Sequence, residues 1–285
     1  LQQIFVNMRE MLSNSCLEES QILGIGVCMN ARAMKFLQLK ITNHVPDYSV
    51  LEKCFQYEFS VPVVFDSIIN GIACAEIDFS KRIPADENMI VIHFADQIEA
   101  TLVVNNELYR GFHNNAMDLA HMVVKSDGSP CRCGRKGCAL TEFSDEFIYV
   151  KIVNIFSKEK TPRLYEKMNG NPNLLRVADV HEYVCLGDEG VEELFDARLE
   201  SFAVFINNLV HIIDPQRIVF FGRQFENEAF MKRVKDGTRD ALGQEACDLV
   251  TSSYLQQDNI YLSGCALAVR RFFIERGGFS QTRES

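Results

Sequence analysis

The feature that most constrains this chain of 285 residues is a short cluster of cysteines. The segment CRCGRKGC contains Cys131, Cys133 and Cys138, and His121 precedes it by ten residues. Zinc in proteins takes four thiolate or imidazole ligands at about 2.0–2.3 Å. The glycines of the segment allow its backbone to fold tightly around an ion. The sequence therefore predicts one Zn²⁺ ion bound by these four residues.

Two other interpretations of the cluster stay open at this stage. Cys138 could form a disulfide, although one between Cys131 and Cys133 would be strained because so few residues separate them. His121 could be a buried core imidazole rather than a ligand. If zinc is bound, four protein ligands leave no open coordination position, so the ion would be structural, not catalytic. It would then stabilise the fold by roughly 10 kcal/mol at most.

Composition excludes several classes of function. The net charge is −10, which predicts a poor surface for nucleic acid. The longest apolar stretches, such as Ile218 to Phe221, have the length of a core strand and not of a membrane span. Residues 1–15 lack the basic start and continuous apolar run of a signal peptide. The remaining cysteines are scattered in apolar surroundings, as in a reducing compartment. We expect a cytoplasmic protein without membrane contact.

Strand and helix patterns alternate along the chain, which predicts an α/β fold. Residues 1–15 form an amphipathic pattern with Ile4, Phe5, Met8, Met11 and Leu12 on one face. Ser49 and Glu52 form a possible capping box for a helix that ends near residue 59. Other predicted elements are strands at 22–29, 61–65, 89–94 and 217–221, a hairpin at 100–109, and helices at 70–78, 191–213 and from about 265.

The spacing from His121 to Cys138 resembles the zinc signature of the ROK family (repressors, open reading frames and sugar kinases). Segments before and after it resemble other parts of the family in the same order. These segments are ILGIGV (22–27), VPVVFDSIINGIACAE (61–76), ELYRGFHNNAMDLAH (107–121), DPQRIVFFG (214–222) and SGCALA (263–268).

The resemblance implies a two-lobed actin-like ATPase (ribonuclease H-like) fold with a sugar held in the cleft between the lobes. The smaller N-terminal lobe would comprise residues 1–86 with 266–285. The larger C-terminal lobe would comprise residues 87–265, with the zinc loop and the helices of a dimer interface. The chain opens on a helix at Leu1, without the strand that opens family members, so we expect a fragment of a longer protein with a truncated N-terminal lobe.

The sequence departs from the family pattern where a kinase needs its reacting groups. The Asp-x-Gly-Gly-Thr segment that cradles phosphate is not present. The family's sugar-site segment Glu-Asn-Asp-Ala-Asn reads Asp66-Ser67-Ile68-Ile69-Asn70 here. Ile68 therefore stands where the family has its general base, and an alkyl side chain cannot accept a proton. A positioned base typically contributes roughly 10²–10⁴-fold to the rate.

The second phosphate loop and the sugar contacts also depart from the family. The glycine-rich turn after strand 89–94 is replaced by a segment with Asp96 and Glu99, whose carboxylates would repel ATP. Leu140 stands where the family has a glutamate. The family's Gly-Glu pair before the zinc histidine reads Met117-Asp118 here. Asp118 could equally be a solvated surface residue. The remaining candidates for ligand binding are Ser67, Asn70, Asp118 and His121.

The resemblance and its departures together predict the effector-sensing and dimerisation region of a sugar-responsive transcriptional regulator without catalytic residues. Its partners would be a second copy in a homodimer, a small sugar or sugar derivative as effector, and DNA only through a domain upstream of Leu1. A divergent sugar kinase that phosphorylates hexoses with ATP is the first alternative. A zinc-stabilised dimeric scaffold without a ligand is the second.

Overall fold

The computed structural model describes residues 1–42, 45–80, 87–95, 97–114 and 116–275 and divides into two compact units. The first unit consists of Leu1–Ile83, Gly111–Asn114 and Asp258–Ser285, and the second of Pro84–Arg110 and Asn115–Gln257. The lobe boundaries expected from the sequence stay a prediction. No helix in the described ranges combines the length and the apolarity that crossing a bilayer requires.

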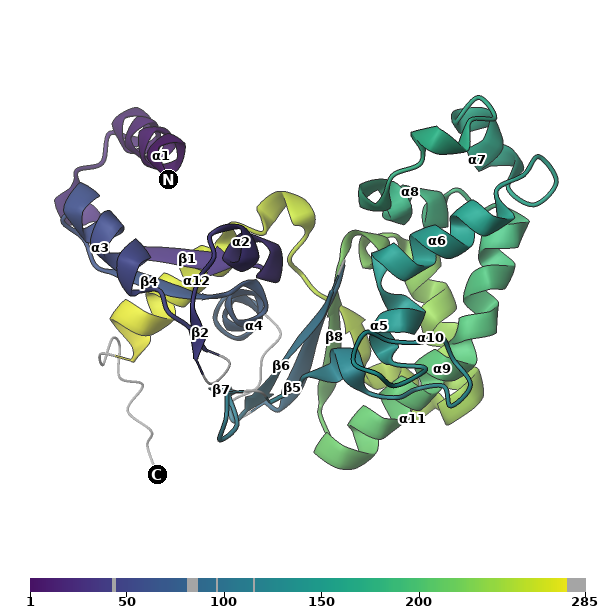
Figure 1. Ribbon diagram of the computed structural model, residues 1–285. Coiled ribbons are helices and arrows are strands. Elements are labelled where there is room, and N and C mark those ends of the chain that lie inside the picture. Colours follow the sequence, from purple (N-terminus) through teal and green to yellow (C-terminus); the bar gives the residue numbers. More distant parts are fainter. Residues whose placement is uncertain (43–44, 81–86, 96, 115, 276–285) are drawn as a thin grey trace. The chain divides into compact units, whose positions relative to one another are not determined.

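Two parallel strands form the centre of the first unit (Figure 1). β1 (Ile25–Met29) pairs with β4 (Val63–Ser67), with Ile25 opposite Val63. β1 starts later than the sequence pattern indicated, because Ile22 closes a 3₁₀ turn by donating its N–H to the oxygen of Glu19. The other elements are α1 (Gln2–Ser15), α2 (Ala31–Phe36), β2 (Ile41–Thr42), β3 (Val45–Pro46), α3 (Ser49–Glu58), α4 (Ile68–Asp78), α12 (Leu262–Val269) and the π-helical turn Arg270–Ile274.

The helix α12 packs directly on β1 and α4. A Cβ atom on Gly26 would lie 1.9 Å from the carbonyl oxygen of Gly264, so only glycine fits at this strand position. Farther along, the guanidinium of Arg270 donates two hydrogen bonds to Asp78, at 2.9 and 2.7 Å. Bidentate pairs of this kind fix relative orientation. The C-terminal segment is therefore an integral part of the first unit.

The N-terminal helix is amphipathic, although its buried face is narrower than the sequence pattern indicated. Phe5, Met8 and Leu12 pack against the core of α3 and β4, whereas Ile4 and Met11 are exposed.

The capping box expected at Ser49 and Glu52 was wrong. Tyr48 occupies the N-cap of α3 with φ −88° and ψ 0°, so Ser49 already lies inside the helix. Its N–H donates instead to the Asp47 carboxylate, at 3.0 Å.

The second unit contains a five-stranded mixed sheet in the order β7-β6-β5-β8-β9. β5 (Met89–Phe94) is antiparallel to β6 (Ile98–Val104) and parallel to β8 (Arg217–Phe221). β6 continues into β7 (Glu107–Tyr109) through Asn105 and Asn106, whose positive φ angles of 53° and 62° fit a tight hairpin turn. The strand β9 (Val250–Ser252) completes the sheet.

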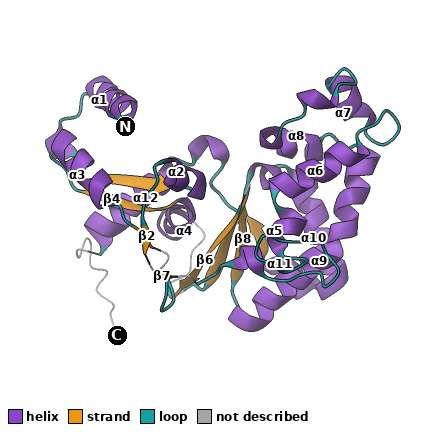
Figure 2. Ribbon diagram, viewed as in Figure 1, coloured by secondary structure: helices purple, strands orange, loops and turns teal. Residues whose placement is uncertain are grey.

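Helices cover this sheet and extend beyond it (Figure 2). The strand side chains pack with those of α5, α9 and α10 in one apolar core, and α6, α7 and α8 form a second core. The longest helix ends at Asp214, which adopts a left-handed conformation with φ 52°. These helices are α5 (Ala139–Phe143), α6 (Asp145–Ile155), α7 (Pro162–Lys167), α8 (Val180–Cys185), α9 (Glu189–Ile213), α10 (Glu228–Leu242) and α11 (Gln244–Leu249).

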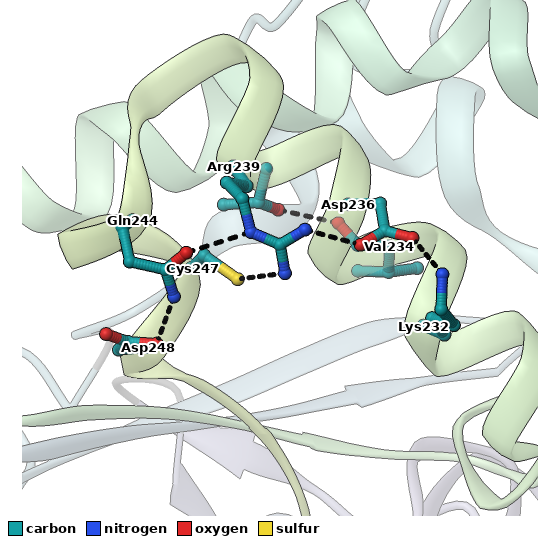
Figure 3. Close-up of polar contacts among 8 residues, drawn as sticks. Lys232, Val234, Asp236, Arg239, Gln244, Cys247 and Asp248 are labelled. Carbon is teal, nitrogen blue, oxygen red and sulfur yellow. Dashed lines mark hydrogen bonds and ion pairs between the residues drawn. The ribbon is translucent and has the colours of Figure 1, made fainter.

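A polar network joins α10 to α11 across the turn at Gly243 (Figure 3). Arg239 is its centre and donates to Asp236 at 2.7 Å, to Gln244 at 2.9 Å and to the Cys247 sulfur at 3.6 Å. The contacts span both helices, so this network has a structural explanation and does not indicate a ligand site.

Candidate functional site

The structure brings together the four residues predicted to bind metal. His121 ends a 3₁₀ turn (Leu119–His121), and Cys138 is the N-cap of α5. Cys131 and Cys133 lie in the connecting segment. One donor atom from each of the four residues lies within 4.8 Å of all the others. We call residues 121–138 the cysteine loop.

Distances between the donors fit a tetrahedral ion. The Cys131 sulfur lies 3.5 Å from His121 Nδ1, and the sulfurs of Cys133 and Cys138 are 3.6 Å apart. Ligands at about 2.0–2.3 Å from a tetrahedral centre are separated by about 3.5–3.8 Å. Sulfurs joined in a disulfide would be about 2.05 Å apart. The two distances are compatible with donors around one ion and exclude a disulfide between Cys133 and Cys138.

Backbone hydrogen bonds within the loop hold the donors in position. Cys131 N–H donates to the oxygen of Arg135 at 2.8 Å, and Gly137 N–H donates to Ser129 at 2.9 Å. Gly137 has φ 64°, and a Cβ atom there would lie 1.5 Å from the carbonyl oxygen of Lys125. The glycine is therefore required for the loop to close on itself.

The thiols of the loop have opposite tendencies to ionise. A hydrogen bond from Arg135 lowers the pKa of Cys133 to about 6, whereas burial raises the pKa of Cys138 to about 12. Both thiols must lose their protons to bind a metal. The positive charge of a divalent ion would supply the stabilisation that a buried thiolate at position 138 needs.

A second candidate region, in the first unit, is the junction between β4 and α4. Ser67 is the N-cap of α4, and its hydroxyl accepts from the Asn70 N–H at 3.4 Å. The Asp66 carboxylate accepts from Ser67 N–H and from the side-chain amide of Asn70, both at 2.7 Å. Asp66, at the end of β4, thus stabilises the start of α4. Ile68 is the first residue of that helix and offers no proton acceptor.

A third candidate region, in the second unit, is the connection from β5 to β6, where the sequence comparison placed a missing phosphate loop. The connection is a tight hairpin in which Ala95 N–H donates to the oxygen of Gln97 at 3.1 Å. His93 and Glu99 are paired across the strands, with 3.4 Å between Nδ1 and a carboxylate oxygen. Asp96 lies outside the described residues. Strand pairing thus continues to Phe94 and Ile98, on either side of this turn.

The structure adds a carboxylate to this region that the sequence analysis did not single out. Asp145 begins α6 and donates its N–H to the oxygen of Ala95 at 3.1 Å. Burial raises the pKa of its carboxyl to about 6, against a smaller opposing effect of His93. Only tertiary contacts bury Asp145, so no signal in its local sequence distinguishes it from an ordinary first-turn helix residue.

The predicted ligand-binding residues are divided between the units. Ser67 and Asn70 belong to the first unit, and Asp118 and His121 to the second. Asp118 precedes the 3₁₀ turn of His121 and is exposed. The ring nitrogen Nδ1 of His121 faces the Cys131 sulfur, which leaves Nε2 for another partner.

Known proteins share this sequence pattern and fold. A xylose repressor of Bacillus subtilis (strain 168) is 22% identical over 199 residues, which cover 70% of this chain and 47% of the repressor. A ROK family glucokinase from Streptomyces griseus, solved with glucose and AMPPNP, has a TM-score of 0.61 and 18% identity over 77% of this chain and 72% of its own. A ROK family transcriptional regulator, homologous to the MLC protein of Escherichia coli, has a TM-score of 0.63 and 16% identity over 95% of this chain and 68% of its own.

The structural similarities show the fold, and repressors and sugar kinases are both among the relatives. The chain spans about half the length of the curated relatives that it matches first. Its structural neighbours have the actin-like ATPase fold. The sequence profile of the ROK family matches residues 4–270. With this extent of agreement, the chain belongs to the ROK family.

Proposed function

We propose that this chain is the effector-sensing and dimerisation region of a sugar-responsive ROK regulator and has no kinase activity. The observation on which the proposal rests is the start of α4. Ile68 occupies the position that the family pattern gives to the general base, and the carboxylate two residues earlier, Asp66, accepts hydrogen bonds from Asn70 and Ser67. Without a base, the sugar hydroxyl has no acceptor for its proton.

The β5–β6 hairpin supports the same proposal. Backbone N–H groups can surround a phosphate only when the loop leaves them unpaired. Here strand pairing extends to Phe94 and Ile98, and Glu99 adds a negative charge beside the turn. Asp145 adds a further carboxyl group nearby. The triphosphate of ATP would meet acidic side chains rather than donors.

For the cysteine loop we propose a structural zinc ion. Three thiols and one imidazole are ligands that zinc prefers, and the four occupy every tetrahedral position. The ion would join the turn of His121 to the start of α5.

For the effector we propose a small sugar or sugar derivative. Ser67, Asn70, Asp118 and His121 remain the candidate contacts. If Nδ1 of His121 binds metal, its Nε2 carries the proton and can donate to a hydroxyl. Leu140 is buried and replaces a carboxylate of the family pattern. An unmodified hexose should therefore bind more weakly than a derivative with an apolar edge, such as a deoxy or N-acetyl sugar.

The proposed partners follow from the relatives and from α9. Val204 and Ile212 are exposed on this helix, at 40% and 73%, and a second copy of the chain could cover them. DNA would be bound only through a domain upstream of Leu1, if the full protein has one. A cytoplasmic location fits this role.

Two assays test the proposal with purified protein. Radiolabelled ATP with a panel of hexoses and N-acetylhexosamines should yield no sugar phosphate. Turnover of about 1 per second or faster would make the kinase alternative, favoured by the glucokinase likeness, the better assignment. A thermal-shift screen of the same sugars should show stabilisation by at least one of them. If no sugar binds and light scattering shows a dimer, the ligand-free scaffold is the better assignment.

A further inference from the structure

A pocket of about 420 Å³ lies within the second unit, away from the residues assigned above. The cysteine loop, α5, α6 and α9 all contribute to its lining. None of the four candidate effector contacts lines it, and neither do the cysteines. Its charged side chains come from Lys125, Glu142, Lys151, Lys160, Glu193 and Arg198.

Cations outnumber carboxylates in this pocket by four to two, in a chain whose net charge is −10. Within the described ranges, Lys125, Lys151 and Lys160 form no ion pair. Arg198 is 7% exposed, and its guanidinium donates to two backbone oxygens, those of Glu142 at 3.0 Å and of Leu194. These two carbonyl oxygens accept hydrogen bonds from the guanidinium but do not neutralise its positive charge.

The cations lie close enough to repel one another. Burial is the largest effect on the pKa of Lys151 and lowers it. The charges of Arg198 and Lys125 lower it further, against an opposing effect of Glu142. Burial also lowers the pKa of Arg198, against an opposing effect of Glu142. Gathering like charges costs free energy unless an opposite charge offsets the repulsion.

We propose that this pocket binds a small phosphorylated metabolite through Lys125, Lys151, Lys160 and Arg198. A phosphoryl group is a dianion with three acceptor oxygens, which suits several ammonium groups and one guanidinium. Pockets of this volume hold small organic ligands and exceed what a bare ion needs. Asn154 and Glu193 line the same pocket and offer partners to the hydroxyls of the organic part. The ligand would be separate from the proposed sugar effector.

Isothermal titration calorimetry tests this with inorganic phosphate, glycerol 3-phosphate and glucose 6-phosphate, and with glucose as the uncharged comparison. At least one phosphate should bind with a Kd of about 1 mM or below. Lys151→Gln should weaken it about tenfold, because a bond between charged groups is lost. The matched control is Lys158→Gln, which removes the same charge from an exposed lysine outside the pocket. Raising the salt concentration should weaken binding to the unchanged chain.

Thermal unfolding and metal content establish that each variant is folded, and Lys160→Gln replaces Lys151→Gln if the latter is not. Binding lost in the pocket variant and kept in the control supports the site. Equal affinity in both variants, or no binding of any of the three phosphates at about 10 mM, overturns it. If glucose binds and Lys151→Gln does not change its heat of binding, we assign that binding to the proposed effector site. The two proposals can therefore fail separately.

Discussion

The cysteine loop and the β4–α4 junction descend from the same family pattern but keep different parts of it. The loop has all four donor residues, and their atoms lie within 4.8 Å of one another. The junction retains a strand followed at once by a capped helix, yet its expected base is Ile68. The comparison shows that a chain can keep the backbone geometry of its family while the side chains at reacting positions are replaced. A helix needs a cap and an apolar face, whereas it does not need a carboxylate in its first turn.

The prediction with the largest expected effect concerns the zinc ion proposed for the cysteine loop. Cys138→Ser should abolish stoichiometric zinc and lower the free energy of unfolding by roughly 5 kcal/mol, because the metal no longer joins α5 to His121. Metal analysis and urea unfolding measure both quantities. Cys16→Ser, at an exposed cysteine outside the loop, is the control and should change neither. A Cys138→Ser protein with unchanged stability would show that the loop needs no ion.

A smaller effect is expected for the pH dependence of stability that arises from Asp145, near the β5–β6 hairpin. The pKa of Asp145 rises from 3.8 to about 6 on folding. Between these values the folded state binds more protons than the unfolded state, so the contribution of Asp145 to stability falls as the pH rises from about 4 to about 6. Asp145→Asn removes this pH-dependent fall in stability. The variant should nearly match the unchanged chain near pH 4 and exceed it by about 3 kcal/mol at pH 7.

Urea unfolding of both proteins at each pH measures this difference. The comparison at equal pH cancels the contribution of the metal ligands, which also titrate. A constant difference from pH 4 to pH 7 would mean that Asp145 ionises normally in the folded protein.

The third effect concerns the helix cap at the junction. Ser67→Ala should cost about 0.5–1 kcal/mol, since the hydroxyl accepts from Asn70 N–H over a long 3.4 Å. Chemical unfolding measures it, with Ser13→Ala, at an exposed position in the last turn of α1, as the comparison. A cost similar to that of Cys138→Ser would remove the contrast between the two regions.

The smallest expected effect is on activity. Ile68→Asp restores a carboxylate at the position of the family's base, and it should still give no ATP-dependent sugar phosphorylation. The hairpin after β5 remains without a phosphate loop, so a base alone has no positioned ATP to work with. The radiolabelled-ATP assay measures the product. Turnover in this variant would show that Ile68 is the single difference from a kinase.

The sequence by itself determined those features that depend on contiguous residues. The cysteine loop spans residues 121–138, and its ligand residues and glycines can be read directly. Strands β5 and β8 and the Asn105-Asn106 turn were also predicted correctly, because apolar runs and turn residues act locally. The loss of the base at Ile68 needed only the family pattern.

Tertiary structure decided the features that depend on distant segments. The N-cap of α3 is Tyr48 and not the predicted Ser49, and α1 buries only part of its predicted apolar face. In both helices tertiary packing overrides the local preference. Asp145 became a partly buried acid through tertiary contacts, which include its backbone hydrogen bond to Ala95. The cationic pocket joins Lys125 to Arg198, two residues far apart in the chain. Burial and electrostatic interaction depend on which side chains meet in space, and no local pattern specifies that.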